Sequence, residues 1–206
     1  MTSRHLILLL LALFLSPVAQ AQSAKRSLDE FFNGLRTLQG RFEQTITQNS
    51  RVIQRTQGAL AVLRPGKFRW QYESPFEQLI TTNGEMLWVY EPDLDQVTLS
   101  ALDASVGNTP AILLSTDESL DKVFTIVDAG LKEGLNWAML DPLSEQSTFR
   151  RIFLGFNAHG LMAMDIVDAL DQTISIHFSE LRRNVKLDPK LFEFEIPAGV
   201  DVIGGE

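Results

Sequence analysis

The chain has 206 residues, of which 18 are Lys or Arg and 26 are Asp or Glu, and it contains no cysteine. Its formal charge of −8 disfavours nucleic acid and anionic membranes as partners, because both attract an excess of basic side chains. The lack of cysteine excludes zinc sites built on thiolates, cysteine nucleophiles and lipidation at an N-terminal cysteine.

The first 21 residues have the form of a secretory signal peptide. Arg4 and His5 give a charged start, residues 6–15 are apolar throughout, and Ala19-Gln20-Ala21 fits a cleavage site. The apolar run is about half the ~20 residues that a transmembrane helix needs. Cleavage would leave residues 22–206 with a charge of about −9, because Arg4 is lost and all 26 acidic residues remain. We expect one exported, periplasmic domain of that extent.

A first amphipathic helix is predicted after a short disordered lead-in over residues 22–26. Ser27 and Glu30 have the spacing of a capping box, and Gly40 is placed to end the helix. The apolar residues at helical spacing are Leu28, Phe31, Phe32, Leu35 and Leu38.

From Arg41 the pattern becomes the alternation of β-strands. Strands are predicted at 42–46 and 52–63, and Gly58 inside the second indicates a bulge or bend. From Lys67 to Glu73 alternate residues are aromatic, which predicts a strand with one apolar face. Asn83-Gly84 predicts a type I′ hairpin between strands at 79–82 and 85–90, because this turn needs positive φ at both central residues.

The rest of the chain reads as short helices followed by more strands. A short strand at 96–99 precedes a nearly wholly apolar helix, with Thr109 as N-cap and Pro110 at its first position. A second short helix is predicted at 119–123. Further strands are predicted at 124–127, 135–140, 149–156, 161–167, 173–181 and 193–196. This is a mainly β domain, in which the few short helices are expected to cover the concave side of a strongly curved sheet.

No enzyme motif is present. Beyond the signal segment the only histidines are His159 and His177, and unpaired histidines carry no mechanism by themselves. We therefore expect no catalytic residue, no metal site and no cofactor. A periplasmic hydrolase of acyl or glycan substrates stays open as an alternative, because carboxylates are plentiful but scattered.

Arg64 combines a charge with an apolar setting. By alternation it shares a face with Leu60 and Val62, so on a concave face its guanidinium needs acceptors, and helix C-terminal carbonyls could supply them. The ordinary reading is a solvated arginine at a strand end.

Three motifs together resemble the periplasmic outer-membrane lipoprotein carriers, the LolA family. They are Arg64-Pro65-x-x-Phe68-x-Trp70, Asn83-Gly84-x-x-Leu87-Trp88-x-Tyr90-x-Pro92 and Gly107-Asn108-Thr109-Pro110. The resemblance implies an incomplete antiparallel β-barrel of about eleven strands, with a helical lid over an apolar concave face. It also implies a function: receiving triacylated lipoproteins from an inner-membrane ABC transporter and delivering them to an outer-membrane acceptor.

The resemblance also assigns residues. Arg64 is expected to hold the lid closed through backbone oxygens of the lid helices, and Phe68 to meet the transporter at the mouth. The remaining positions expected in the mouth, concave face and lid, where acyl chains bind, are Phe32, Trp70, Leu79, Trp88, Ile112, Leu113 and Leu114. We expect a monomer. The alternative within the same fold is a periplasmic sensor or carrier of a different lipid.

Overall fold

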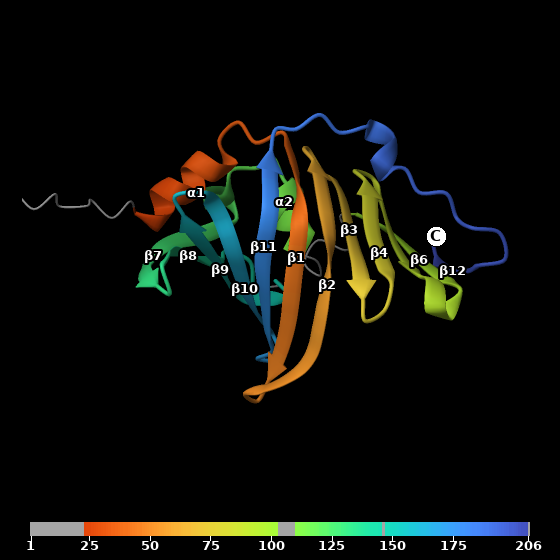
Figure 1. The fold of residues 1–206 in the computed structure, drawn as a ribbon, viewed down its shortest axis with the longest axis horizontal. Helices are drawn as coiled ribbons and strands as arrows, with labels where there is room; N and C mark the ends of the chain where they lie inside the picture. The colour runs from red at the N-terminus through yellow and green to blue at the C-terminus, as the bar shows by residue number, and fades with distance from the viewer. Residues whose placement is uncertain (1–22, 103–109, 146, 206) are drawn as a thin grey trace, which may run out of the picture.

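A single curved sheet of twelve strands dominates the part of the chain that the structure describes, which is residues 23–102, 110–145 and 147–205 (Figure 1). The structure is a computed structural model. The predicted signal peptide and the predicted N-cap Thr109 lie outside the described residues. Within the described ranges, no helix has the length and apolar character needed to cross a bilayer.

The sheet is antiparallel except at one edge. Its strands run in the order β12-β6-β5-β4-β3-β2-β1-β11-β10-β9-β8-β7, and only β12 and β6 are parallel. The strands are β1 Thr37–Gln48, β2 Arg51–Leu63, β3 Lys67–Ser74, β4 Gln78–Asn83, β5 Met86–Glu91, β6 Gln96–Ala101, β7 Phe124–Lys132, β8 Leu135–Pro142, β9 Phe149–Asn157, β10 Gly160–Asp168, β11 Thr173–Arg183 and β12 Asp201–Gly204. The helices are α1 Ala24–Phe32 and α2 Pro110–Ser115, with the 3₁₀ turns η1 Pro92–Leu94, η3 Leu120–Lys122 and η4 Pro189–Phe192.

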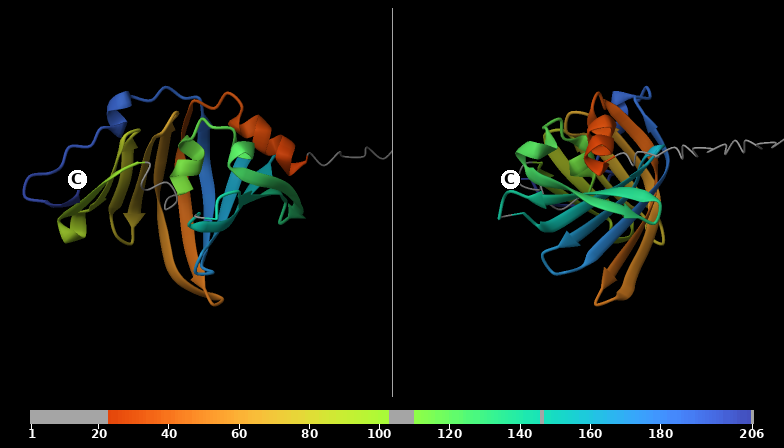
Figure 2. Two further views of the ribbon diagram at one scale, coloured as in Figure 1. Left: turned by 180° about the vertical axis from the view of Figure 1, so that it is seen from behind. Right: turned by 90° about the vertical axis from the view of Figure 1, so that its left-hand side faces the viewer.

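The sheet curls into an unclosed barrel, because its terminal strands β7 and β12 do not pair with each other. Both α-helices lie on the same side of the curled sheet, as two further views show (Figure 2). We call this side the inner face and the opposite side the outer face. The predicted incomplete barrel with helices over its concave side is confirmed, with twelve strands in the described residues instead of about eleven.

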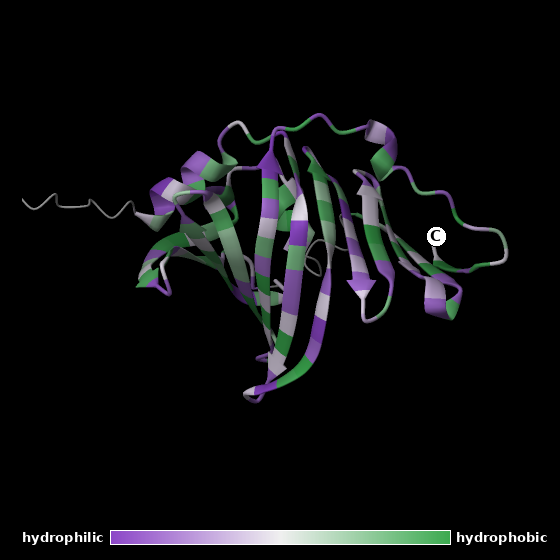
Figure 3. Ribbon diagram, in the orientation of Figure 1, coloured by the Kyte–Doolittle hydropathy of each residue, from purple (hydrophilic) through white to green (hydrophobic). Residues whose placement is uncertain are grey.

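Alternation along the strands produces the two faces, and hydropathy bands change from residue to residue along most of them (Figure 3). In β3 the side chains of Phe68, Trp70 and Tyr72 are buried, while the residues between them are partly exposed. The inner-face side chains of β1–β3 and β8–β11 join those of α1 and α2 in one hydrophobic cluster. The fold is therefore stabilised mainly by apolar contacts between the sheet and its helices.

Gly58 allows two strands to approach closely. The register of β2 against β3 shifts between Gln57 and Gly58, so the predicted bulge is confirmed. A Cβ atom at Gly58 would lie 1.9 Å from the carbonyl oxygen of Gln71 on β3, a distance that no side chain tolerates. Glycine is required here by the bulge and the close backbone contact.

The first helix is shorter, and starts earlier, than the sequence pattern predicted. Its N-cap is Ser23, whose hydroxyl accepts from the Arg26 amide, and its C-cap is Asn33. The predicted boundaries at Ser27 and Gly40 were wrong, because Thr37 already starts β1 and pairs with β2. Gly40 lies inside β1, where a Cβ would be 2.6 Å from Leu181 Cδ2 on β11. Pairing on both sides of β1 outweighed a helical spacing of leucines.

The hairpin between β4 and β5 is confirmed, but its turn type is not. Gly84 has a φ of +100°, whereas Asn83 does not have a positive φ, so the predicted type I′ turn was wrong. Instead, the Asn83 side-chain oxygen accepts from the amides of Glu85 and Met86, both at 3.0 Å. An asparagine side chain that caps its own turn replaces the left-handed residue.

The last predicted strand, residues 193–196, was also wrong. This segment runs across the outer face without pairing, and the final strand is β12, which pairs in parallel with β6. Phe192 is only 1% exposed, and the ring of Phe194 lies 6.2 Å from Trp88 and 5.6 Å from Tyr90. Aromatic contacts with the sheet therefore hold this segment in place of a backbone ladder.

Candidate functional site

The inner face carries a continuous apolar surface. Phe68 and Trp70 of β3 are both 0% exposed, and the Trp70 ring lies 4.3 Å from Phe42 on β1 and 6.4 Å from Phe178 on β11. Leu60 and Val62 of β2 belong to the same cluster. The site thus begins as a row of large side chains that strand alternation directs to one side of the sheet.

Two helices cover different parts of this surface. α1 contacts β7 to β10, and its Phe31 ring lies 5.9 Å from that of Phe156 on β9. α2 contacts β2 and β3. Within α2, Leu113 and Leu114 are buried, whereas Ile112 is partly exposed, and from α1 Phe32 packs on the same cluster while also partly exposed. The predicted lid residues therefore do sit on the inner face together with Phe68 and Trp70.

Arg64, directly after β2, joins the two helices. Its Nη1 donates to the carbonyl of Phe32 at 3.2 Å and to that of Leu35 at 3.3 Å, and its Nη2 donates to the carbonyl of Thr116. Phe32 ends α1, and Thr116 follows directly after α2. The guanidinium also lies 5.8 Å from the centre of the Phe32 ring. One side chain thus satisfies carbonyls at the C-terminal ends of both helices.

Burial and a nearby charge have opposite effects on the Arg64 guanidinium. Burial lowers the pKa of Arg64 from its usual value, and the nearby charge of Asp117 raises it in part. The side-chain Nε of Arg64 is buried and has no hydrogen-bond partner within the described ranges. The guanidinium remains charged, because arginine is not deprotonated in proteins, so its hold on the helices is opposed by a desolvation cost.

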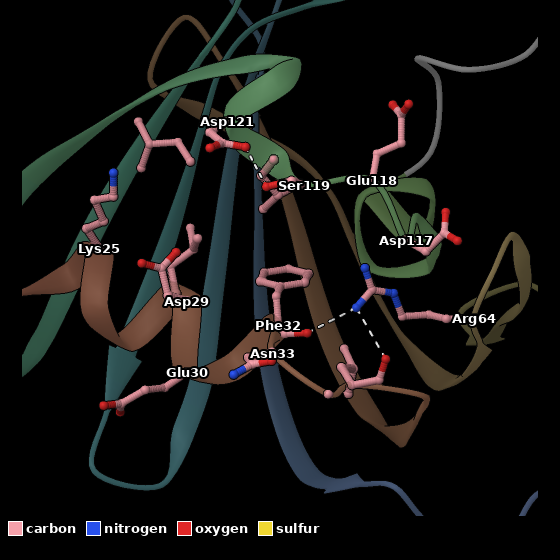
Figure 4. A pocket seen from close by; sticks show the side chains of 15 residues that line it. Lys25, Asp29, Glu30, Phe32, Asn33, Arg64, Asp117, Glu118, Ser119 and Asp121 are labelled. Atoms are coloured by element: carbon pink, nitrogen blue, oxygen red, sulfur yellow. Dashed lines mark hydrogen bonds between the residues drawn. The ribbon is translucent and has the colours of Figure 1, made fainter.

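A cavity of about 710 Å³ opens beside Arg64, between α1 and the segment around η3 (Figure 4). Its wall combines Leu28, Phe32 and Ile126 with the charged residues Lys25, Asp29, Glu30, Asp117, Glu118 and Asp121. In Figure 4 the Phe32 side chain and the Arg64 guanidinium both lie at this cavity. The opening between α1 and the segment around η3 is therefore lined by both charged and apolar side chains.

A second cavity, of about 190 Å³, lies next to α2. Its lining is mostly apolar and includes Ile112 and Leu113 of α2, Phe149 and Ile152 of β9, and Met164 of β10. A gap among such side chains shows that α2 does not fill the space between itself and this half of the sheet. Apolar cavities of this kind favour apolar ligands.

Leu79 and Trp88 are not on the inner face, contrary to the expectation from sequence. Residues directly opposite each other on neighbouring strands share a face. Leu79 is opposite Gln71, and Trp88 is opposite Thr81, which is opposite Arg69, so both belong to the outer row of β3. Both side chains lie on the side covered by the C-terminal segment. On β4 and β5 the inner positions are taken instead by Ile80 and Leu87.

Phe68 lies on the inner face but has no exposed surface in this conformation. Its ring belongs to the cluster under the helices, and its backbone oxygen accepts from the Thr81 hydroxyl at 3.0 Å. A partner could reach this side chain only after the helices move. Contact between Phe68 and a transporter stays a prediction.

Sequence reasoning missed several residues of the site. The carbonyls of Leu35 and Thr116 hold Arg64, but any residue type offers a carbonyl, so no sequence signal marks them. Phe42 could have been found from the alternation of its strand. Within the described residues, no group of three or more His, Asp or Glu side chains is arranged to hold a metal ion.

An open sheet with an apolar inner face, short helices over it and an arginine between the helix ends defines the class of unclosed β-barrels with a helical lid. The chain belongs to the LolA family: a family profile described as "Outer membrane lipoprotein carrier protein LolA" matches residues 33–195. A protein of Nitrosospira multiformis named "Outer-membrane lipoprotein carrier protein" is 43% identical over 179 residues, which are 86% of each chain. A protein of the same name from Methylococcus capsulatus is 42% identical over 186 residues, 89% of each chain.

A solved structure also shares the fold. A crystal structure of an uncharacterized conserved protein from Thermus thermophilus superposes with a TM-score of 0.55 at 15% identity, covering 88% of this chain and 99% of that chain. At this identity the likeness supports the fold alone.

Proposed function

We propose that this protein carries triacylated lipoproteins through the periplasm, from an inner-membrane ABC transporter to an outer-membrane acceptor. Membership of the LolA family and the names of its relatives support the lipoprotein cargo. The single observation that carries the mechanism is that Arg64 bonds to backbone carbonyls at the ends of both helices over the apolar inner face. Export by the predicted signal peptide, residues 1–21, would deliver the protein to that compartment.

The energetics explain why a carrier needs a lid that opposes binding. Each CH₂ group removed from water contributes about 0.8 kcal/mol, so full burial of three long acyl chains would exceed the ~20 kcal/mol seen in the tightest non-covalent complexes. A carrier that bound so tightly could not release its cargo. In our proposal the bonds of Arg64 must break when lipid enters, and their loss lowers the net affinity enough for an acceptor to draw the cargo onward.

The cargo would occupy the space that α1 and α2 now cover. The larger cavity borders α1 and Arg64, and the apolar cavity borders α2, so outward movement of the helices would join both cavities to the inner face. Arg64 would then lose its carbonyl partners and turn toward water. Phe68 would be uncovered in the same movement, which is the state in which we expect it to contact the transporter.

The test is release of a lipoprotein from inner-membrane vesicles into a soluble complex with the mature protein. Substituting Phe68 by Glu would bury a charge in the core, so the informative variant is Ile112→Glu, which places the charge on a partly exposed lid residue. Ile53→Glu is the matched control, because Ile53 is 55% exposed at the far end of β2.

We expect the wild type and Ile53→Glu to release lipoprotein as a one-to-one complex, and Ile112→Glu to release at least tenfold less. Equal release by Ile112→Glu would refute the role of the lid. If neither the wild type nor the control releases cargo while the transporter is active, the protein does not take lipoproteins from it. Mass spectrometry of lipids that copurify with the protein would then identify a different cargo.

A further inference from the structure

Four side chains form a polar cluster on the otherwise apolar inner face: Gln44, Thr56, Trp70 and Tyr72. Gln44 and Thr56 lie directly opposite each other on β1 and β2, and both are buried. The Tyr72 hydroxyl donates to Gln44 Oε1 at 3.3 Å. Trp70 and Tyr72 both pack on the ring of Phe42, at 4.3 Å and 5.3 Å. The polar cluster is thus inside the hydrophobic site and does not belong to the solvated surface.

Two atoms of the polar cluster have unmet hydrogen-bonding capacity. Thr56 is 5% exposed, yet its Oγ1 finds no partner among the residues that the structure describes. Trp70 is 0% exposed, and its Nε1 makes no hydrogen bond of regular geometry there, although it interacts with the Tyr72 hydroxyl. Buried polar groups in proteins are almost always paired, because an unpaired one destabilises the fold. Valine in place of Thr56 would avoid this cost with a side chain of similar shape. Such groups on a ligand-facing surface indicate a role in binding.

The polar cluster also borders an accessible space. A cavity of about 280 Å³ is lined by Gln44 and Thr56 together with Glu43, Thr45, Arg55, Gln57 and Ser74. It lies where β3 ends, at the register shift between β2 and β3. Glu43, Thr45, Arg55 and Gln57 alternate with Gln44 and Thr56 along their strands, so the cavity reaches the polar cluster from the outer side of the sheet.

The chemistry of the polar cluster selects the kind of group that it can bind. The indole N–H of Trp70 only donates and the hydroxyl of Thr56 is able to donate, whereas the single O–H of Tyr72 already donates to Gln44 Oε1. All four side chains are uncharged at neutral pH, because burial raises the pKa of Tyr72 further above its usual value. The cluster therefore offers donors to a neutral acceptor, because burying a carboxylate among these four uncharged side chains would cost much more than burying a carbonyl group.

We propose that the polar cluster binds a carbonyl oxygen of an acyl ester or amide and so fixes the orientation of an acyl ligand in the barrel. The inference rests on the proposed function, which supplies acyl chains as ligands. From Thr56 to Arg64, β2 spans about 26 Å at ~3.3 Å per residue, and the inner-face residues between them include Leu60 and Val62. The hydrocarbon would lie along this stretch toward the lid, with its carbonyl at the end opposite Arg64.

The experiment compares two probes that differ only in the carbonyl: a long-chain alkyl methyl ester and an ether of the same chain length. Each competes with an environment-sensitive dye bound to the wild type, to Thr56→Val and to Tyr72→Phe. One hydrogen bond corresponds to about a three- to tenfold change in affinity. We expect the wild type to prefer the ester by that factor and Thr56→Val to lose the preference. Tyr72→Phe, which removes the hydroxyl that bonds to Gln44, should weaken the preference, and both variants should bind the ether as tightly as before. Thr125→Val, on the exposed part of β7, is the control and should keep the preference.

Two further readouts separate a binding role from a structural one. Thr56→Val should leave the melting temperature of the lipid-free protein unchanged or raised, because it removes an unpaired hydroxyl. A lowered melting temperature, or an ester preference that is absent in the wild type or unchanged in Thr56→Val, would overturn the proposal. If neither probe displaces the dye from the wild type, acyl binding itself is refuted, and the polar cluster loses its ligand with it.

Discussion

Replacing Arg64 by leucine tests the lid contact directly. Leucine keeps an apolar side chain at the end of β2 but cannot donate to the carbonyls of Phe32, Leu35 and Thr116. The helices would lose a side chain that joins their C-terminal ends. We expect the variant to bind acyl ligands more tightly and to accumulate as the loaded form.

The size of the effect follows from the bonds that are lost. Hydrogen bonds to a charged group contribute about 1.5–3 kcal/mol each, but desolvation of the guanidinium and the unpaired Nε offset much of that sum. We therefore expect the substitution to reduce the stability of the closed state by about 1.5–3 kcal/mol. At about 1.4 kcal/mol for each factor of ten, acyl affinity should rise roughly 10- to 100-fold.

The assay is displacement of a fluorescent lipid probe, together with the rate of cargo transfer to the acceptor. Arg64→Leu should bind the probe more tightly and transfer cargo more slowly than the wild type. Arg69→Leu is the matched control, because Arg69 is also partly buried but faces the outer side of β3 and donates to the Gln71 side chain instead of to a helix. Unchanged affinity and unchanged transfer in Arg64→Leu would refute the idea that this arginine opposes binding.

Two predictions concern stability. Phe192→Ala should lower the free energy of unfolding by about 3–5 kcal/mol, because it leaves a cavity at a fully buried position of the C-terminal segment. Denaturant titration measures this loss, and a loss below about 1 kcal/mol would contradict the packing. Burial raises the pKa of Tyr72, so folding stability from this group is complete below pH 10 and declines as the pH rises above that value through the folded pKa. Ultraviolet titration of Tyr90→Phe, which leaves Tyr72 as the only tyrosine, should show ionisation above the usual pKa.

Sequence patterns predicted the architecture well where one residue type had one structural meaning. The alternating aromatic residues of β3 located an inner face, Gly58 located a bulge, and Pro110 located the start of α2. The predictions failed where two interpretations fitted the same residues. Leucines at helical spacing near Gly40 also suited a strand that pairs on both sides, and the strand pairing prevailed.

The misplacement of Leu79 and Trp88 has a physical cause that a single sequence does not reveal. Both faces of β4 and β5 are covered, since the inner face lies under the hydrophobic cluster and the outer face lies under the C-terminal segment. Alternation identifies two faces but does not say which one is concave when both are covered. The polar cluster escaped notice for a related reason: Gln44 and Thr56 look like solvated strand residues until the register brings them together.

The unpaired edges of the sheet give the barrel an adjustable width. In a closed barrel a complete ring of backbone hydrogen bonds fixes the radius, so the interior cannot expand without breaking some of them. Here β7 and β12 end the described sheet without meeting, so these two edges can move apart by a change in sheet curvature while every ladder between neighbouring strands stays intact. Cargo of different bulk can then be accommodated at nearly the same cost in backbone bonding, which leaves the contacts of the helices to set how strongly it is held.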